Sequence, residues 1–274
     1  GVAALRTAGS AQDDARGEGR APGPGEVRPD RGVRGPGRAA LSDLVPDDRR
    51  EAEPLAELLE AVAHSSAAGG LLVHTHAAEQ RDEVALVRAS TGLDNLAYFE
   101  AVGLASPRLC AAHCVWVTEA EQAMMAERGV HVLHCPGSNL KLGSGIAPVA
   151  AMRARGISVS LGADGAACNN SLDMFQEMRL AATLQAASAG PASLRAQDVV
   201  WMATRGGARA LGWDSEIGSI EPGKKADLVL VAVDGLHHAA GDGADPYSAL
   251  VYSARPADVV MTLVDGRIVS RGGR

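Results

Sequence analysis

The chain has 274 residues, of which 46% are hydrophobic and 22% are charged, and its formal net charge is -7. This composition excludes a wholly disordered chain, and the negative charge argues against binding to nucleic acid through bulk charge. No run approaches the roughly 18 consecutive apolar residues of a membrane span, so no membrane association is expected. The four cysteines form no CxxC pair, which is typical of a reduced, cytoplasmic chain.

Residues 1–40 are rich in Gly, Pro and Arg and carry almost no large apolar residue after Leu5. Such a segment cannot bury enough apolar surface to offset the entropy of ordering it. We predict that it is disordered, either as a basic interaction tail or as a plain linker. From Leu41 the composition changes, and leucines at helical spacing predict a helix over residues 51–64 that ends in the segment 65–70.

The middle of the chain alternates short apolar runs with helical patterns. Strands are predicted at residues 71–73, 109–113, 130–134 and 157–161, and helices at 83–89, 96–102, 118–127, 172–187 and 196–210. Thr118 is the expected N-cap of its helix, because a threonine oxygen can accept a hydrogen bond from the first turn. This alternation predicts βαβ units, an α/β fold and a parallel sheet.

The last part of the chain is predicted to be a small β-rich unit. Residues 226–233 form a strand-like apolar run, and residues 258–264 and 268–270 flank Asp265-Gly266, a dipeptide typical of hairpin turns. His237 and His238 fall in a loop of this unit, and we expect them at the surface.

Several apolar runs end in side chains that can do chemistry. The first predicted strand leads to His74 and His76, and the following ones lead to His113, His134 and Asp164. Functional groups of parallel α/β folds lie at the carboxyl ends of strands, where loops vary over a rigid scaffold. A lone histidine in an apolar run is more often a core residue, but a succession at one end of a sheet favours a site.

His74 and His76 are two residues apart, so on a strand they point to the same side. Imidazole nitrogens are good zinc ligands, and a carboxylate such as Glu79 can serve as acid or base beside them. Asp164 lies where a strand breaks into a loop, between Ala163 and Gly165. An aspartate there can bind metal, activate water or only cap a turn.

These residues lie in motifs that resemble the amidohydrolase superfamily. The motifs are HTHAAE at 74–79, AAHCVW at 111–116, HCPGSNLKLGSGIAPV at 134–149, SLGADGAACNN at 160–170, MATRGGARALG at 202–212, IGSIEPGKKADLVLV at 217–231 and VDGRIV at 264–269. They are most similar to the zinc-dependent aminohydrolases and chlorohydrolases, which include S-adenosylhomocysteine, 5′-methylthioadenosine and 5′-deoxyadenosine deaminases and triazine hydrolases. The resemblance covers roughly residues 51–274.

The resemblance implies a (β/α)8 barrel with one divalent metal, with Zn²⁺ as the first choice and Fe²⁺ as the alternative. It implies that His76 and Asp164 are metal ligands. Glu79 matches the acid/base that protonates the substrate ring, and His113 matches the histidine that contacts the attacking water or the substrate. Asp164 also matches the group that takes the proton from that water, so Glu79, His113 and Asp164 are the expected catalytic and substrate-binding residues.

Other positions receive weaker expectations. His74 is expected to support the site rather than to bind metal, and His134 and Asn139 are expected to shape the following loop. Cys114 and Cys135 stand beside histidines, but their spacing disfavours a structural zinc site. Trp116 either lines the pocket or packs. A further interpretation makes His74 and His76 the HxH pair of a compact site with His113 and Asp164.

The sequence departs from the family in its first part. Members of the family carry an HxH pair on the first barrel strand, whereas no histidine precedes His64 here, and the first four barrel strands are not evident. We therefore expect an N-terminally truncated chain: a disordered segment at 1–40, the C-terminal half of a TIM-type barrel at 41–213 and strands of a small β-sandwich at 214–274.

Two classes of function follow. The first is an enzyme, a metal-dependent hydrolytic deaminase of an adenosine-type nucleoside or related N-heterocycle, with a triazine-type chlorohydrolase as the close alternative. The second is a non-catalytic half-barrel that pairs with another chain. The expected partners are a small heteroaromatic substrate and, by analogy with the family, a second copy of the chain.

Overall fold

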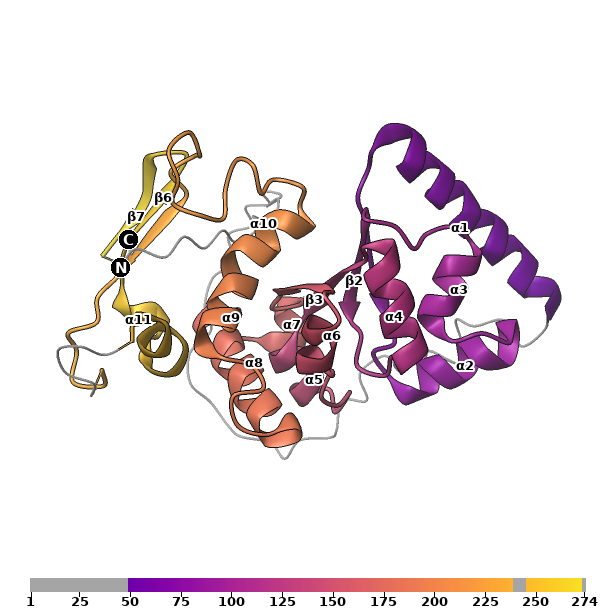
Figure 1. The fold of residues 1–274 in the computed structure, drawn as a ribbon, viewed down its shortest axis with the longest axis horizontal. Helices are drawn as coiled ribbons and strands as arrows, with labels where there is room; N and C mark the ends of the chain where they lie inside the picture. The colour runs from indigo at the N-terminus through magenta and orange to yellow at the C-terminus, as the bar shows by residue number, and fades with distance from the viewer. Residues whose placement is uncertain (1–48, 239–244, 273–274) are drawn as a thin grey trace, which may run out of the picture. The chain divides into compact units, whose positions relative to one another are not determined.

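The computed structural model describes residues 49–238 and 245–272. The segment predicted to be disordered, 1–40, lies outside these residues. The described residues belong to one unit of the chain, and they contain a four-stranded parallel sheet and a three-stranded antiparallel sheet (Figure 1). The predicted α/β class is therefore confirmed, and the parallel sheet does not close into a barrel.

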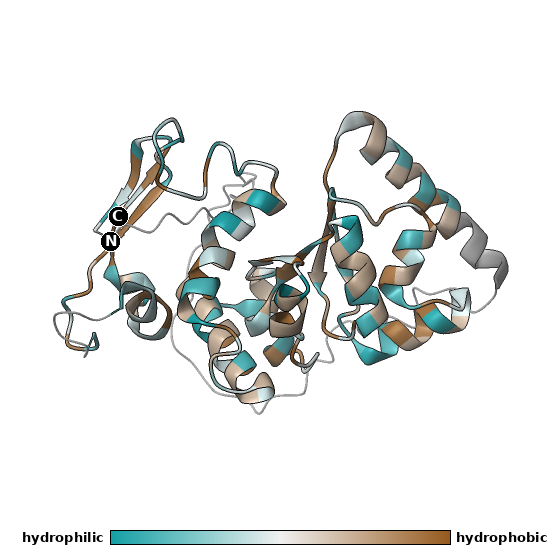
Figure 2. Cartoon of the chain, viewed as in Figure 1, coloured by the Kyte–Doolittle hydropathy of each residue, from teal (hydrophilic) through white to brown (hydrophobic). Residues whose placement is uncertain are grey.

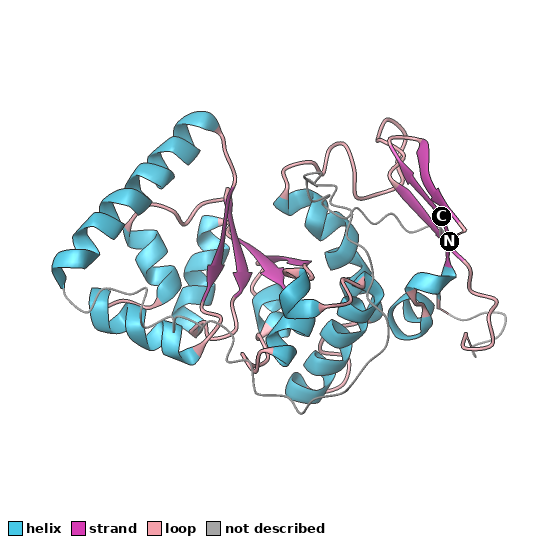
Figure 3. Cartoon of the chain, turned by 180° about the vertical axis from the view of Figure 1, so that it is seen from behind, coloured by secondary structure: helices cyan, strands magenta, loops and turns pink. Residues whose placement is uncertain are grey.

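The parallel sheet contains four strands in the order in which they occur in the chain. They are β1 (Val73–Ala77), β2 (Leu109–His113), β3 (His131–His134) and β4 (Ser158–Leu161), shown in magenta in Figure 3. Every residue of β2 is buried, because β2 is an inner strand of the sheet. The predicted strands at 109–113, 130–134 and 157–161 are confirmed. The second and third of them begin one residue later than predicted.

The prediction for the first strand was wrong in position. Leu71 and Leu72 precede β1 and are 59% and 43% exposed, and the strand consists of the next residues, VHTHA. The register explains the shift, because Val73 pairs with Leu109 and Ala77 pairs with His113. β1 therefore begins and ends where its backbone can form hydrogen bonds with β2. The apolar character of Leu71 and Leu72 does not decide where it begins.

Helices follow the strands, as the alternating pattern predicted. They are α1 (Arg49–Gly69), α2 (Arg81–Thr91), α3 (Asn95–Ala101), α4 (Glu119–Arg128), α5 (Pro136–Lys141), α6 (Val149–Ala154), α7 (Ala166–Asn169), α8 (Met174–Ala189), α9 (Ala196–Trp201) and α10 (Gly207–Ala210). Thr118 caps α4 by accepting a hydrogen bond from the Glu121 amide at 3.2 Å, which confirms the predicted cap. The short helices α5, α6 and α7 were not predicted.

Two predicted helices differ from those observed. The first, α1, continues to Gly69, almost to the end of the segment 65–70 that was expected to break it. Its last turn is fixed by a 2.6 Å hydrogen bond from Ser66 Oγ to the Leu71 carbonyl. The second, predicted over 196–210, contains a π-helical turn, η2 (Met202–Gly206), between α9 and α10. A Cβ on Gly206 would lie 2.8 Å from the Val159 carbonyl oxygen, so glycine lets this turn approach β4 closely.

The core lies between the parallel sheet and the helices that follow it. Leu109, Val132, Met152 and Met202 are fully buried in one cluster that also includes residues of α8 and α9. Hydrophobic and hydrophilic residues are interspersed along α8 and α9 (Figure 2), as expected for helices that bury one face. The core thus holds the strands rigidly beneath the loops at their carboxyl ends.

The second sheet is antiparallel and contains β5 (Leu228–Val231), β6 (Val259–Val264) and β7 (Arg267–Arg271). Between β5 and β6 lie α11 (Pro246–Ser248), the π-helical η3 (Ala249–Ser253) and the 3-10 turn η4 (Pro256–Asp258). The predicted hairpin is confirmed: Val264 pairs with Arg267, and Asp265 and Gly266 both have positive φ, as a tight two-residue turn requires.

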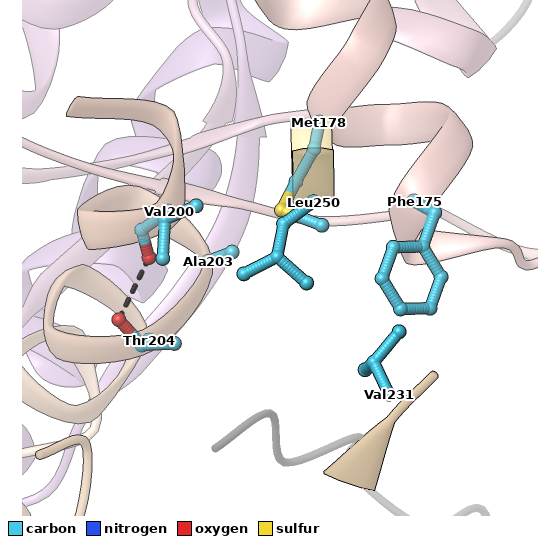
Figure 4. A pocket seen from close by; sticks show the side chains of 7 residues that line it. All are labelled: Phe175, Met178, Val200, Ala203, Thr204, Val231 and Leu250. Carbon is cyan, nitrogen blue, oxygen red and sulfur yellow. Dashed lines mark hydrogen bonds between the residues drawn. The ribbon is translucent and has the colours of Figure 1, made fainter. Parts of the chain in front are cut away.

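Segments of the terminal part pack against α8. Arg179 of α8 donates hydrogen bonds to the carbonyls of Tyr252 at 3.1 Å and Ala254 at 2.8 Å. Beside this contact is a small, mostly apolar pocket, shown in Figure 4. It is lined by Phe175, Met178, Val200, Ala203, Thr204, Val231 and Leu250. The Thr204 hydroxyl turns away to donate to the Val200 carbonyl at 2.7 Å, so the pocket offers no side-chain polar group for a ligand.

Across the described ranges, none of the helices combines the length and apolar character that a bilayer crossing requires.

Candidate metal and acid–base site

The two histidines of β1 point to the same side of the strand. His74 and His76 are the exposed positions of an alternating pattern, while Ala77 at the carboxyl end is buried. Partial desolvation of the ring, then the neighbouring His76 and His113, lowers the pKa of His74. The ring of His76 stacks on that of His113, with centroids 5.3 Å apart and planes inclined by 16°. His76 is thus directed toward His113 at the end of β2.

A carboxylate fixes the turn that follows β1. Glu83 Oε1 accepts a hydrogen bond from the Ala78 amide at 2.9 Å, and Oε2 accepts from the amides of Glu79 at 2.8 Å and Gln80 at 3.2 Å. Ala78 has φ of 50°, a conformation that costs energy for a residue with a Cβ. Glu83 therefore holds a strained turn and determines where the Glu79 side chain begins. Sequence reasoning did not identify this residue.

Glu79 lies between a serine and a histidine. Its Oε1 accepts a hydrogen bond from Ser144 Oγ at 3.0 Å, and its Oε2 is 3.9 Å from His113 Nε2. Gln80 Nε2 in turn donates to Ser144 Oγ at 2.6 Å, which leaves the serine proton free for Glu79. Ser144 is buried, so this arrangement fixes one carboxylate oxygen and leaves the other facing His113.

His113 ends β2 in a left-handed conformation with φ of 68°, and its side chain is buried. Its Nδ1 is 2.8 Å from Asn139 Oδ1. Because an amide oxygen can only accept, this contact places a proton on Nδ1, and in the neutral ring Nε2 then carries the lone pair. Asn139 therefore orients His113, a more specific role than the expected shaping of a loop.

Asp164 follows β4 and also has positive φ, 62°. Its Oδ2 accepts a hydrogen bond from Ser138 Oγ at 2.5 Å, and its Oδ1 accepts from the Gly165 amide at 2.7 Å. Burial by itself raises the pKa of this carboxyl, but the hydrogen bonds from Ser138 and Gly165 outweigh it and hold the pKa below its ordinary value. Asp164 is therefore kept in its charged form.

A second carboxylate supports the loops around Asp164. Glu177 of α8 is fully buried and accepts hydrogen bonds from the Gly137 amide at 2.9 Å and from Asn169 Nδ2 at 2.8 Å. Burial raises the pKa of Glu177, although these two hydrogen bonds oppose the shift. Glu177 thereby connects the start of α5 with the end of α7. Only its position in an apolar helix could have signalled this role in the sequence.

The remaining predicted residues lie around this centre. His134 is buried, and neither ring nitrogen has a hydrogen-bond partner among the described residues. Burial, with a smaller contribution from His113, lowers the pKa of His134 to about 3, so this ring is neutral. Trp116 Nε1 donates to the Ser144 carbonyl at 2.8 Å, and the Arg81 guanidinium lies 4.0 Å from the Trp116 ring centroid, which indicates a packing role.

Two side-chain clusters in the described part of the chain could hold a metal ion, and neither includes a cysteine. Cys114 and Cys135 are buried, and burial raises their pKa, that of Cys135 to about 12. Thiols that stay protonated are poor metal ligands. The structure therefore offers no support for a Cys/His zinc site here.

The first cluster contains His76, His113 and Asp164, and one ligand atom from each lies within 4.8 Å of the others. His74 is not part of it. Two imidazole nitrogens and a carboxylate oxygen are a donor set that suits zinc and other first-row divalent ions. The residues therefore fit a divalent metal, and His113, expected beside the metal-activated water, lies close enough to be a third ligand.

Known proteins similar to this chain include curated deaminases. The chain is 47% identical over 218 residues to a 5′-deoxyadenosine deaminase from Methanothermobacter thermautotrophicus, a match that covers 79% of this chain and 50% of the relative. The chain thus spans about half the length of the curated relatives it matches.

Solved structures of two zinc-bound hydrolases are also similar to this chain. A zinc-bound adenosine deaminase from Xanthomonas campestris superposes with a TM-score of 0.76 at 40% identity, over 80% of this chain and 50% of that one. A zinc complex of the atrazine chlorohydrolase from Arthrobacter aurescens superposes with a TM-score of 0.74 at 29% identity, over 80% and 48%. The profile of the Amidohydrolase family matches residues 48–269. The chain belongs to the amidohydrolase family.

Proposed function

We propose that this chain carries the acid–base half of the active site of a metal-dependent hydrolytic deaminase. The proposed substrate is an adenosine-type nucleoside or a related N-heterocycle. The observation that carries the proposal is the convergence of His76, His113 and Asp164, with Glu79 Oε2 3.9 Å from His113 Nε2. The deaminase names of the relatives support the substrate class.

We propose His76 and Asp164 as metal ligands, with His113 beside them. Zn²⁺ is the first choice because the superposed structures contain zinc, and Fe²⁺ is the alternative. A divalent ion held there would supply Lewis acidity, which makes water a far stronger acid and hence a nucleophile near neutral pH. Substrate binding and the proton transfers would be carried out by side chains of the chain itself.

Glu79 would bind and protonate the substrate. Its Oε1 is held by Ser144, so Oε2 is the atom free to face the ring. A proton delivered from Oε2 to a ring nitrogen makes the adjacent carbon electrophilic. Because Glu83 fixes the turn on which Glu79 stands, this proton would be delivered from a defined position.

Asp164 and His113 would handle the attacking water. Asp164, held in its charged form by Ser138 and Gly165, accepts a proton from water while the carbon–oxygen bond forms. His113 Nε2, with its lone pair directed inward, accepts a hydrogen bond from the same water or from the substrate. Asp164 then passes its proton to the amine, the carbon–nitrogen bond breaks, ammonia leaves, and Glu79 recovers the proton that it gave.

The test combines metal content with product analysis. We expect this cluster to hold one zinc ion per chain that is lost in His76→Ala and Asp164→Asn and retained in Asp214→Asn, whose side chain is exposed. The zinc-loaded chain is then incubated with 5′-deoxyadenosine, adenosine and S-adenosylhomocysteine, and ammonia is measured. Ammonia that Glu79→Gln abolishes supports the proposal. Metal binding without ammonia from any of these nucleosides would overturn the proposed activity of this chain.

A chlorohydrolase is the second candidate, supported by the superposed atrazine chlorohydrolase. The same attack by water can expel chloride instead of ammonia, and Glu79 would protonate a triazine nitrogen in the same way. The two candidates are separated by the product. Chloride released from a chlorotriazine at a higher rate than ammonia from any nucleoside would favour this alternative.

A non-catalytic pairing role is the third candidate, supported by the edges of the parallel sheet. In the described residues, β1 and β4 each have one strand neighbour, and a bare edge offers hydrogen bonds to another chain. Such a chain could be a second copy, which gives a homodimer. Light scattering of the purified chain tests this directly, since a strictly monomeric chain would contradict pairing with itself.

We further propose the division of the chain that the sequence predicted, with a barrel half at 41–213 and sandwich strands at 214–274. The change from parallel β4 to antiparallel β5 supports it. A reducing, cytoplasmic compartment is proposed on the free state of Cys110, Cys114, Cys135 and Cys168. Small-molecule chemistry in that compartment is consistent with a nucleoside substrate.

A further inference from the structure

A second cluster of metal-capable side chains lies in the terminal part of the chain, apart from the site already described. It consists of His237 and His238, in the loop after β5, and Asp258, at the end of η4. His237 Nε2 is 2.8 Å and His238 Nε2 is 3.2 Å from Asp258 Oδ2. One ligand atom from each residue lies within 4.8 Å of the other two.

The backbone holds these three side chains in place. The His238 amide donates to the Gly235 carbonyl at 2.8 Å, which closes a turn and brings the two rings within 4.3 Å of each other. A Cβ on Gly235 would lie 2.8 Å from His237 Cε1, so the His237 ring packs directly over this glycine. Asp258 is held through its own carbonyl, which accepts a hydrogen bond from the Ala232 amide at 2.8 Å.

The cluster is largely withdrawn from water. The side chain of His238 is 3% exposed, that of Asp258 is 11% exposed and that of His237 is 27% exposed. The expectation that both histidines lie at the surface was therefore wrong for His238. A partly buried carboxylate such as Asp258 attracts a cation more strongly than a fully exposed one, because solvent screens it less.

Hydrogen bonding alone does not account well for the contacts of Asp258. Its Oδ2 is approached by three nitrogens, His237 Nε2, His238 Nε2 and the Arg255 amide, the last at 3.0 Å. One carboxylate oxygen offers about two lone-pair sites, so three hydrogens compete for them. A single cation that replaces the two imidazole protons would remove this competition. It would be bound by His237 Nε2, His238 Nε2 and Asp258 Oδ2, and two nitrogens and one oxygen are a favourable donor set.

We propose that His237, His238 and Asp258 form a second binding site for a first-row divalent metal, of the Zn²⁺ type. The site fastens the loop after β5 to the start of β6, so its role is structural. It is independent of the proposed deaminase chemistry, because none of its ligands belongs to the first cluster.

The site is tested with Co²⁺ as a spectroscopic probe of the full chain. We expect two bound ions per chain, one of which is lost in His237→Gln and in Asp258→Asn, while the other is lost in His76→Ala. Dissociation constants from calorimetry should show that His237→Gln weakens one binding event at least tenfold. His64→Gln, which replaces an exposed histidine outside both clusters, is the matched control and should bind like the unmodified chain.

Thermal unfolding provides a second measurement and guards against misfolded variants. In His76→Ala, added Zn²⁺ should still raise Tm, because the second site remains and binding to the folded state stabilises it. The rise should disappear when His237→Gln is added to that background, with an unchanged circular dichroism spectrum. Unchanged stoichiometry and affinity in both His237→Gln and Asp258→Asn, or loss of all metal in His76→Ala, would overturn the proposal.

Discussion

Replacement of Glu83 by alanine should destabilise the chain far more than its partly exposed position suggests. The substitution removes the acceptor for the amides of Ala78, Glu79 and Gln80, and for Asn95 Nδ2 as well. The amide nitrogens of Glu79 and Gln80 lie in partly exposed residues, so water can replace part of what they lose. Ala78 is only 1% exposed, so its amide has little access to such a replacement.

The magnitude follows from these contacts. A buried donor without a partner costs about 1–3 kcal/mol, and loss of a helix cap costs about 1 kcal/mol more. For Glu83→Ala we therefore expect a loss of about 3 kcal/mol in the free energy of unfolding, on the order of a hundredfold in the folding equilibrium constant. Glu83→Gln keeps one carbonyl acceptor but turns amide hydrogens toward the backbone donors, so an intermediate loss is expected.

Urea unfolding followed by circular dichroism measures this effect, with a constant slope as the check that only stability has changed. Asp82→Ala is the matched control, since Asp82 is an exposed acidic residue in the first turn of the same helix. It should cost less than about 1 kcal/mol, the value of a charge near a helix N-terminus. Equal shifts of the urea midpoint in Glu83→Ala and Asp82→Ala would refute the reasoning.

Three further predictions rest on single residues. Burial lowers the pKa of His134 to about 3, so below pH 6.5 the unfolded chain binds more protons than the folded one, and stability falls as the pH drops toward 3. His134→Leu should therefore make the dependence of the urea midpoint on pH shallower between pH 7 and 4. An unchanged dependence contradicts the prediction. Ser144→Ala frees Glu79 Oε1 and should lower kcat and shift the pH profile of ammonia release, whereas a change in KM alone would argue against a positioning role. Gly137→Ala places a Cβ 2.3 Å from Glu177 Oε1 and should cost about 1–3 kcal/mol through overpacking. Gly207→Ala is the comparison, because the space around Gly207 is open and its φ of -62° suits alanine.

The sequence predicted local features best where local chemistry decides them. The strand Leu109–His113, the Thr118 cap and the Asp265-Gly266 turn were all found, because an apolar run, a capping oxygen and a positive φ act over a few residues. The first strand was misplaced because its limits depend on pairing with Leu109–His113, far along the chain. Hydrophobicity favoured Leu71 and Leu72, but the hydrogen bonds of β2 begin at Val73.

The residues of the candidate site also fall into a predictable group and an unpredictable group. The convergence of His76, His113 and Asp164 was foreseeable, since parallel strands bring their carboxyl ends to one edge of a sheet. The supporting residues were not foreseeable, because Ser144 meets Glu79 across 65 positions and Glu177 meets Gly137 across 40. Neither serine nor glutamate carries a spacing signal at such separations, and only the folded chain reveals these contacts.

The order of the parallel strands has a consequence for how the chain acquires its fold. Each of β2, β3 and β4 pairs with the strand made just before it, in the order β1-β2-β3-β4, so none of these three must wait for a strand made later. The paired residues lie 36, 21 and 27 positions apart in Val73–Leu109, Cys110–His131 and His131–Ser158, and closing loops of this length costs less entropy than closing longer ones. As the chain leaves the ribosome, each new strand can form hydrogen bonds to the strand synthesised before it. The sheet can therefore grow during synthesis, one strand and its helix at a time.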